Sequence, residues 1–109
     1  MERISIEYFK KVELRIGKII EVKEHPEADK LFILKVDFGD EEKTIVTGLR
    51  GHYKIEELDG RKAVFVVNLE PAVLRGVESD GMILAGVSDD RKNIKVLFAD
   101  KAEVGMRIS

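Results

Sequence analysis

Apolar and polar residues alternate along most of the chain, and a period of two residues predicts β-strands with one buried face. The first alternating run, which includes Ile16, Ile20 and Val22, predicts one long curved strand over residues 12–24. Gly17 marks the point where this strand bends or approaches another backbone closely. Further runs with the same period predict strands within "LFILKVDFG", "EKTIVTGL", "RKAVFVVNL", "GMILAGV" and "NIKVLF".

Two short segments lack this alternation and predict helices. Residues 5–11 predict an N-terminal helix, with Ser5 as its cap and Glu7 in its first turn. Residues 53–58 carry helix-forming side chains and are followed by an Asp-Gly turn signal. The chain therefore orders as three strands, a short helix and at least two more strands.

That order is typical of the OB-fold, a five-stranded Greek-key barrel that commonly carries a helix between its third and fourth strands. The sequence therefore predicts an all-β fold of this kind with short helices. An SH3-like barrel or another small β-barrel gives a similar pattern and remains the alternative. At 109 residues the chain fits a single domain over residues 1–109.

Residues 94–109 exceed what five barrel strands require. They bring further apolar side chains that need cover, namely Val96, Phe98, Val104 and Ile108. A subunit interface would bury them, so the sequence predicts that residues 94–109 form a dimerisation extension.

Composition narrows the chemistry. There is no cysteine and there are only two histidines, so neither a metal nor another cofactor is expected. No apolar run approaches the roughly 20 residues of a membrane span, and the N-terminus lacks the apolar core of a signal peptide, which predicts a cytoplasmic protein without membrane contact. The net charge is −2, so any surface for a polyanion must be a local patch.

Signatures of catalysis are missing from the sequence. Neither common phosphate loop, G-x-G-x-x-G or G-x-x-x-x-G-K-[ST], occurs. Acidic pairs such as Glu41 with Glu42 fall in predicted turns or the short helix, where solvated charge explains them. We therefore expect a binding module and not an enzyme.

The loop "HPEADKL", residues 25–31, follows the first predicted strand, where an OB-fold places a binding loop. Taken alone, Pro26 and Asp29 explain it as an ordinary turn in which His25 is a surface or turn residue. The loop "TGLRGHY" likewise predicts a turn, with Arg50 and His52 as loose exposed groups.

The stretch "LRGVESDGM", residues 74–82, follows a predicted strand. Its two glycines permit a tight turn that keeps Arg75 and Ser79 outside. In a barrel of this order, the first loop, the region around the helix and the approach to the fifth strand converge on one rim. The three segments are therefore expected to lie together.

Four segments of the chain together resemble the tRNA-binding domain family, which occurs at the C-terminus of many methionyl-tRNA synthetases and as free-standing homodimeric proteins. They are "VELRIGKIIEVKEHPEADKLFILKVDFGDE", "TGLRGHYKIEEL", "VVNLEPAVLRGVESDGMILA" and "DKAEVGMRIS". The resemblance covers about residues 8–109. It implies an OB-fold whose C-terminal extension forms a homodimer and which binds tRNA for its shape.

The resemblance also implies which residues contact tRNA. The principal positions are Lys30, Asn68, Arg75, Ser79 and Met82, and the weaker ones are Lys18, Arg50 and His52. Lysine and arginine neutralise phosphates, asparagine and serine donate to phosphate or the 2′-OH, and methionine can lie against a sugar or base. The implied partners are tRNA, a second copy of the chain, and the catalytic part of a methionyl-tRNA synthetase, whose aminoacylation the module would assist.

The chain departs from the family pattern at Glu70 and Val73, where relatives often carry basic residues, and at Ile55, where proline is usual. A secretion-chaperone branch of the same fold is the alternative, because it also forms small homodimers and binds peptides. Members of that branch lack an intact "ADKL" and the "LRGxxSxGM" segment, and this chain has both. The sequence therefore favours tRNA over peptide as the ligand.

Overall fold

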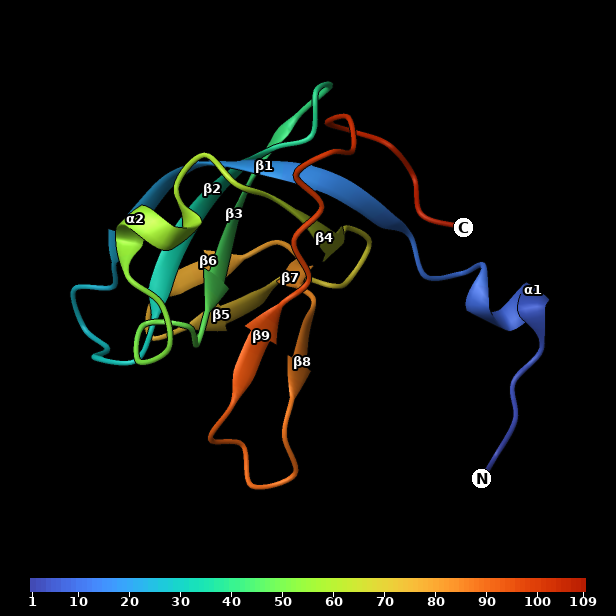
Figure 1. The fold of residues 1–109 in the computed structure, drawn as a ribbon, viewed down its shortest axis with the longest axis horizontal. Coiled ribbons are helices and arrows are strands. Elements are labelled where there is room, and N and C mark those ends of the chain that lie inside the picture. Colours follow the sequence, from blue (N-terminus) through green and yellow to red (C-terminus); the bar gives the residue numbers. More distant parts are fainter.

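A five-stranded antiparallel sheet curls into a nearly closed barrel in the computed structural model, which describes residues 1–109 (Figure 1). The elements in chain order are α1 (Ile6–Phe9), β1 (Leu14–Glu24), β2 (Phe32–Asp37), β3 (Glu42–Thr47), α2 (Ile55–Leu58), β4 (Lys62–Val66), β5 (Ala72–Leu74), β6 (Val77–Ser79), β7 (Met82–Ile83), β8 (Ala85–Val87) and β9 (Ile94–Val96). The predicted all-β class and OB-type barrel are confirmed.

The sheet has the order β3-β2-β1-β4-β7, so β3 and β7 are its edges. The edges do not pair directly. The barrel is closed instead by two hydrogen bonds from β3 to the segment before β7: the Val46 amide donates to Ser79 Oγ over 2.9 Å, and the Asp80 amide donates to the Thr44 carbonyl over 2.8 Å. The helix α2 lies between β3 and β4 in the chain and inserts Leu58 into the core.

The prediction of which β1 side chains face the core is wrong at one position. A β-bulge between Ile19 and Glu21 shifts the alternation, so Ile19 is fully buried while Ile20 is exposed. For Gly17 the predicted close neighbour was another backbone, and the structure shows side chains instead: a Cβ at this position would lie 2.5 Å from Val36 Cγ1 and 2.7 Å from Phe38 Cε1. Only glycine leaves room for these side chains, which come from the neighbouring strand β2 and the residue after it.

Both predicted helices form, but each has four residues and is shorter than expected. In α1 the Ser5 hydroxyl accepts from the Tyr8 amide over 3.0 Å and Glu7 occupies the first turn, as predicted. The stretch "GMILAGV" was expected as one strand and instead divides into β7, which pairs with β4, and β8, which pairs with β9.

The β8–β9 hairpin projects from the barrel (Figure 1). Even so, other parts of the same chain cover apolar residues at the end of β9 and just after it. Val96 is buried in the core, and the Phe98 ring packs edge-on against Tyr53 with 6.0 Å between centroids. The expectation that both need a partner subunit for cover is therefore wrong. The exposed apolar side chains at the chain ends belong to residues 1–12 and 106–108.

Candidate nucleic-acid interface

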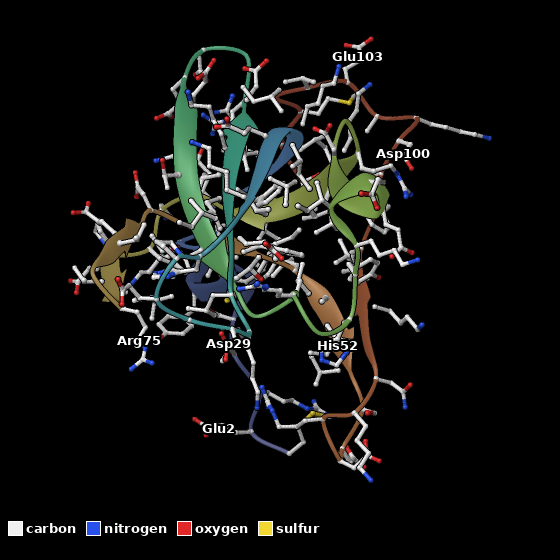
Figure 2. The ribbon with its side chains drawn as sticks, turned by 90° about the vertical axis from the view of Figure 1, so that its left-hand side faces the viewer. Glu2, Asp29, His52, Arg75, Asp100 and Glu103 are labelled. Carbon is white, nitrogen blue, oxygen red and sulfur yellow. The ribbon has the colours of Figure 1, made fainter.

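Three segments that are distant in sequence meet at one edge of the barrel: residues 25–31, residues 48–52 and the β5–β6 turn at residues 74–77. We call this edge the loop rim. The Arg50 amide donates to the Lys30 carbonyl over 3.3 Å, which joins the first two segments. Figure 2 shows Asp29, His52 and Arg75 along the same edge. The predicted convergence is confirmed.

Lys30 lies exposed on the first segment, as the prediction requires. Its backbone is held by the turn around it: the His25 amide donates to the Leu31 carbonyl over 3.0 Å, and the Leu31 amide donates to the Ala28 carbonyl over 3.3 Å. Its ammonium group forms no ion pair in the structure. Hydrogen bonds therefore fix the backbone of the loop, and its lysine presents a positive charge that has no acidic partner.

Arg75 is the first residue of a two-residue hairpin turn between β5 and β6. Its φ is 52° and that of Gly76 is 89°, and a type I′ turn needs positive φ at both central positions. Asparagine, aspartate or glycine is usual at the first of these, so an arginine in the left-handed region is a costly choice. The exposed guanidinium makes a single long contact, 3.4 Å from Nη2 to the Glu27 carbonyl, and has no acidic partner.

Ser79 is not outside, contrary to the prediction. Its side chain is buried, and its hydroxyl accepts from the Val46 amide over 2.9 Å and donates to the Gly81 carbonyl over 3.2 Å. The hairpin turn is at Arg75 and Gly76, so Ser79 lies at the base of β6, where β6 meets β3. The hydroxyl is used in closing the barrel and cannot also point toward a ligand.

The acids that flank Ser79 differ in their surroundings. Asp80 pairs with Lys43, with 2.9 Å between Oδ2 and Nζ. Burial disfavours the charged ammonium, but the hydrogen bonds and charges of Asp80 and Glu41 together outweigh this effect and raise the pKa of Lys43 above its ordinary value. Asp80 is thus neutralised within the fold, whereas Glu78, the other acid beside Ser79, would repel a phosphate.

Arg50 is not a loose exposed group, which corrects the prediction for this residue. Its Nη1 donates to the Ala28 carbonyl over 3.2 Å, and its Nη2 lies 3.0 Å from Glu24 Oε2. The charge and the hydrogen-bond donors of Arg50 therefore hold the first segment of the loop rim in place. His52 is exposed, as expected.

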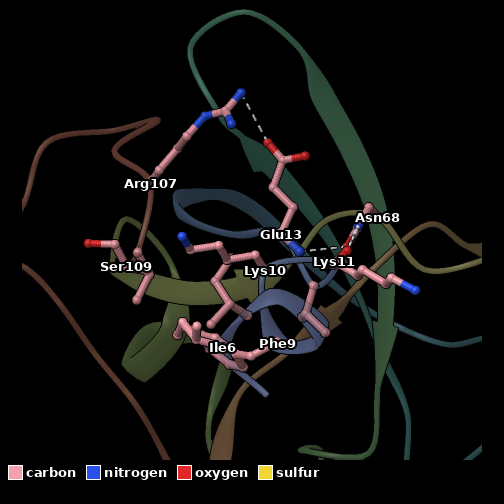
Figure 3. Close-up of a pocket in the computed structure, with 11 residues that line it drawn as sticks. Ile6, Phe9, Lys10, Lys11, Glu13, Asn68, Arg107 and Ser109 are labelled. Carbon is pink, nitrogen blue, oxygen red and sulfur yellow. Dashed lines mark hydrogen bonds and ion pairs between the residues drawn. The ribbon is translucent and has the colours of Figure 1, made fainter. Parts of the chain in front are cut away.

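Asn68 and Lys18 do not join the loop rim. The Asn68 amide clamps the N-terminal segment: Oδ1 accepts from the Glu13 amide over 2.8 Å and Nδ2 donates to the Lys11 carbonyl over 2.6 Å (Figure 3). Lys18 is exposed in the middle of β1, six residues and roughly 20 Å along the strand from its end at Glu24. Neither position lies within reach of Lys30 and Arg75 without movement.

Met82 is half exposed on the edge strand β7, opposite Val66 of β4. It is adjacent in sequence to Gly81, whose backbone passes so close that a Cβ there would lie 2.9 Å from the Val66 carbonyl oxygen. The prediction that Met82 offers an apolar surface fits its exposure.

His25 was expected to be a surface or turn residue, and its burial excludes the first of these alternatives. Its Nδ1 accepts from the Glu27 amide over 3.0 Å, and its Nε2 lies 3.1 Å from the Leu74 carbonyl oxygen. The sequence gives little sign of this, because a histidine before proline in a polar loop is typical of a turn. Its contact with β5 becomes visible only once the fold brings residues 25 and 74 together.

These features define a class: a small OB-type barrel whose loops carry two free cations on one edge. No helix in the chain has the length and apolar character needed to cross a membrane. Residues 14–107 match the family model described as "Putative tRNA binding domain". The chain belongs to this tRNA-binding domain family, and the resemblance noted in its sequence is confirmed.

Similar proteins agree with this assignment. The chain is 55% identical over 101 residues to a methionine–tRNA ligase of Pyrococcus horikoshii, a match that covers 93% of this chain and 14% of the ligase. The chain thus spans about a seventh of the length of the curated relatives it matches. A MetRS related protein from the same organism superimposes with a TM-score of 0.95 at 37% identity, and the match covers all of both chains. The CsaA chaperone protein of Picrophilus torridus superimposes with a TM-score of 0.88 at 32% identity. The match covers 98% of this chain and all of that chain.

The burial of Ser79 generates a testable prediction. Replacing Ser79 by Ala leaves the buried Val46 amide without its acceptor, so the free energy of unfolding should fall by about 1–3 kcal/mol. Urea unfolding followed by circular dichroism measures this change, and Lys92→Ala in the exposed turn between β8 and β9 is the control, with no expected effect. Unchanged stability together with weakened RNA binding in Ser79→Ala would instead place this hydroxyl on the ligand.

Proposed function

We propose that the chain binds folded tRNA as a non-catalytic module, with the loop rim facing the phosphate backbone. The observation that carries the proposal is the pair of cations without acidic partners, Lys30 and Arg75, presented by two segments that hydrogen bonds hold against each other. Phosphate contacts of this kind supply affinity without reading sequence. A duplex of A-form geometry is recognised mainly by such shape-dependent contacts.

The surroundings of Lys30 and Arg75 indicate that charge makes a moderate contribution to the free energy of tRNA binding. Arg50 and Lys43 are already neutralised by acids of the chain, and the whole chain carries a net charge of −2. Val73 and Met82 are exposed near the same hairpin and offer apolar surface for a sugar or base. Binding then combines few phosphate contacts with apolar ones, so its dependence on salt should be shallow.

The relatives suggest how the module is used. We infer that it raises the local concentration of tRNA for a methionyl-tRNA synthetase catalytic domain, to which it is joined or with which it associates. Tethering a second binding site increases overall affinity through effective concentration without new contacts to the reacting groups. Peptide binding is the second candidate, favoured by the similarity to the CsaA chaperone protein and by the exposed side chain of Val73.

The chain ends support a homodimer. The four-residue helix α1 has no buried residue and projects from the barrel (Figure 1), although so short a helix is unstable without packing. Beside it, a groove of about 380 Å³ is lined from both chain ends, with Ile6, Phe9 and Ile108 among its apolar residues (Figure 3). A second copy brings the same helix and tail, so a two-fold pairing would cover both sets at once.

The homodimer is tested by light scattering at micromolar concentration, where the mass should be about twice 12.3 kDa. A double variant, Ile6→Glu with Phe9→Glu, should reduce the mass to that of one chain, because charge on the apolar helix face cannot be buried without a large cost. Val73→Glu also places charge at an exposed apolar residue, but far from the groove, and should remain dimeric. A wild-type protein with the mass of a single chain would contradict the proposal.

The tRNA proposal is tested with two matched arginines. Arg75 and Arg91 are both exposed, and both have left-handed φ, 52° and 60°, at hairpin turns. Arg75→Ala should weaken tRNA binding by about 1–3 kcal/mol and reduce the slope of log affinity against log salt by roughly 1, because one phosphate contact is lost. Arg91→Ala likewise keeps a Cβ at a left-handed φ, in the other hairpin, and should change neither quantity.

Equal effects of the two variants would remove the loop rim as the tRNA site. A filter-binding assay that compares tRNA with single-stranded DNA of matched length separates the ligand classes, because a module that reads tRNA shape should bind the DNA less well. If the wild-type protein binds an unfolded apolar peptide and no tRNA, peptide binding becomes its function.

A further inference from the structure

His25 is buried at the junction of the two segments that carry the free cations. The residue follows β1 directly and begins the first segment of the loop rim, and its imidazole is 2% exposed. A backbone amide can only donate and a carbonyl can only accept. Because Nδ1 meets the Glu27 amide and Nε2 meets the Leu74 carbonyl, the ring must be neutral with its proton on Nε2.

The hairpin that carries Arg75 has few other attachments. Each of its strands has three residues, all residues of β5 are exposed, and a two-stranded hairpin is marginally stable by itself. Ser79 attaches the base of the hairpin to β3. Near the turn, the attachments are the His25 bond to the Leu74 carbonyl and the long contact from Arg75 to the Glu27 carbonyl.

We propose that His25 is a positioning residue for tRNA binding: its Nε2–H group ties the Lys30 loop to the residue that precedes Arg75 and thereby fixes the separation of the two cations. This inference rests on the proposed function and adds the element that aligns its site. His25 itself contacts no tRNA, because it is buried beneath the two segments. Its loss lets the hairpin move, so that Arg75 no longer reaches its phosphate when Lys30 is bound.

Two substitutions each preserve one half of the imidazole's bonding. Asparagine places an acceptor near the position of Nδ1, so His25→Asn keeps the bond to the Glu27 amide and loses the bond to Leu74. Glutamine places a donor near the position of Nε2, so His25→Gln keeps the bond to Leu74. A residue that acts on folding alone would respond similarly to both changes, whereas a positioning residue responds to the loss of the Leu74 bond.

We therefore expect His25→Asn to weaken tRNA binding by about fivefold or more and to lower the salt slope by roughly 1, as loss of one phosphate contact does. His25→Gln should retain the wild-type slope. In the Arg75→Ala background, His25→Asn should cause little further loss, because both changes remove the same contact. All proteins are compared at 25 °C, after circular dichroism has verified that they are folded.

Hydrogen exchange gives a readout that does not depend on tRNA. In His25→Asn the backbone amides of residues 74–77 should exchange faster, while those of the β1–β2 ladder keep their protection. If His25→Asn fails to fold, the imidazole ¹⁵N spectrum of the wild-type protein replaces this test and should show a proton on Nε2 only.

The outcomes separate this proposal from the proposed function. Equal losses in the two His25 variants, additive losses in His25→Asn with Arg75→Ala, unchanged exchange of the hairpin in a protein that binds tRNA, or a proton on Nδ1 would each overturn the role of His25. Absence of tRNA binding by the wild-type protein would overturn the proposed function, even if the exchange data show that His25 holds the hairpin.

Discussion

Closure of the barrel is the constraint on which the loop rim depends. The edge strand β7 has only two residues, too few to satisfy the backbone of β3 along its length. Instead, the Ser79 hydroxyl and the Asp80 amide, which lie just before β7, form hydrogen bonds with β3. Because Ser79 is also the last residue of β6, closing the barrel fixes the base of the hairpin that presents Arg75. An unpaired edge would be exposed to association with other strands.

The cations of the chain divide into two groups by what they bind. Arg15 lies partly buried and donates to the carbonyls of Gly105 and Phe38, while Arg50 donates to the first segment of the loop rim. These two arginines stabilise loops and the C-terminal tail. Lys30 and Arg75 lack acidic partners and remain available to a polyanion. A net charge near zero therefore does not oppose nucleic-acid binding, because cations gathered at one edge can form a local patch for phosphates.

Periodicity predicted the strands because each has one face in the core, whereas the side chains that crowd Gly17 come from other segments and could not be predicted from β1 alone. It failed at Ile20, because a β-bulge depends on how two strands pair and not on the residues of one strand. The resemblance to a family supplied Lys30 and Arg75 together with Ser79 and Asn68. Only the structure separates residues that are free to bind from residues that hold backbone groups.

The buried polar side chains were the least predictable features. A histidine or serine within a polar loop has the same local pattern whether it faces solvent or accepts a distant amide. His25 and Ser79 acquire their roles from partners 49 and 33 residues away in the chain. Such pairings follow from the topology, so they could be anticipated only after the strand order was known.

The most direct test of the central claim is a titration of ¹⁵N-labelled protein with folded tRNA, followed through its backbone amide resonances. The account predicts that shifts and line broadening concentrate at residues 25–31 and 74–77, while the turn at residues 88–93 remains unchanged. Perturbations concentrated at residues 88–93 or at the chain ends, with the loop rim unaffected, would contradict it.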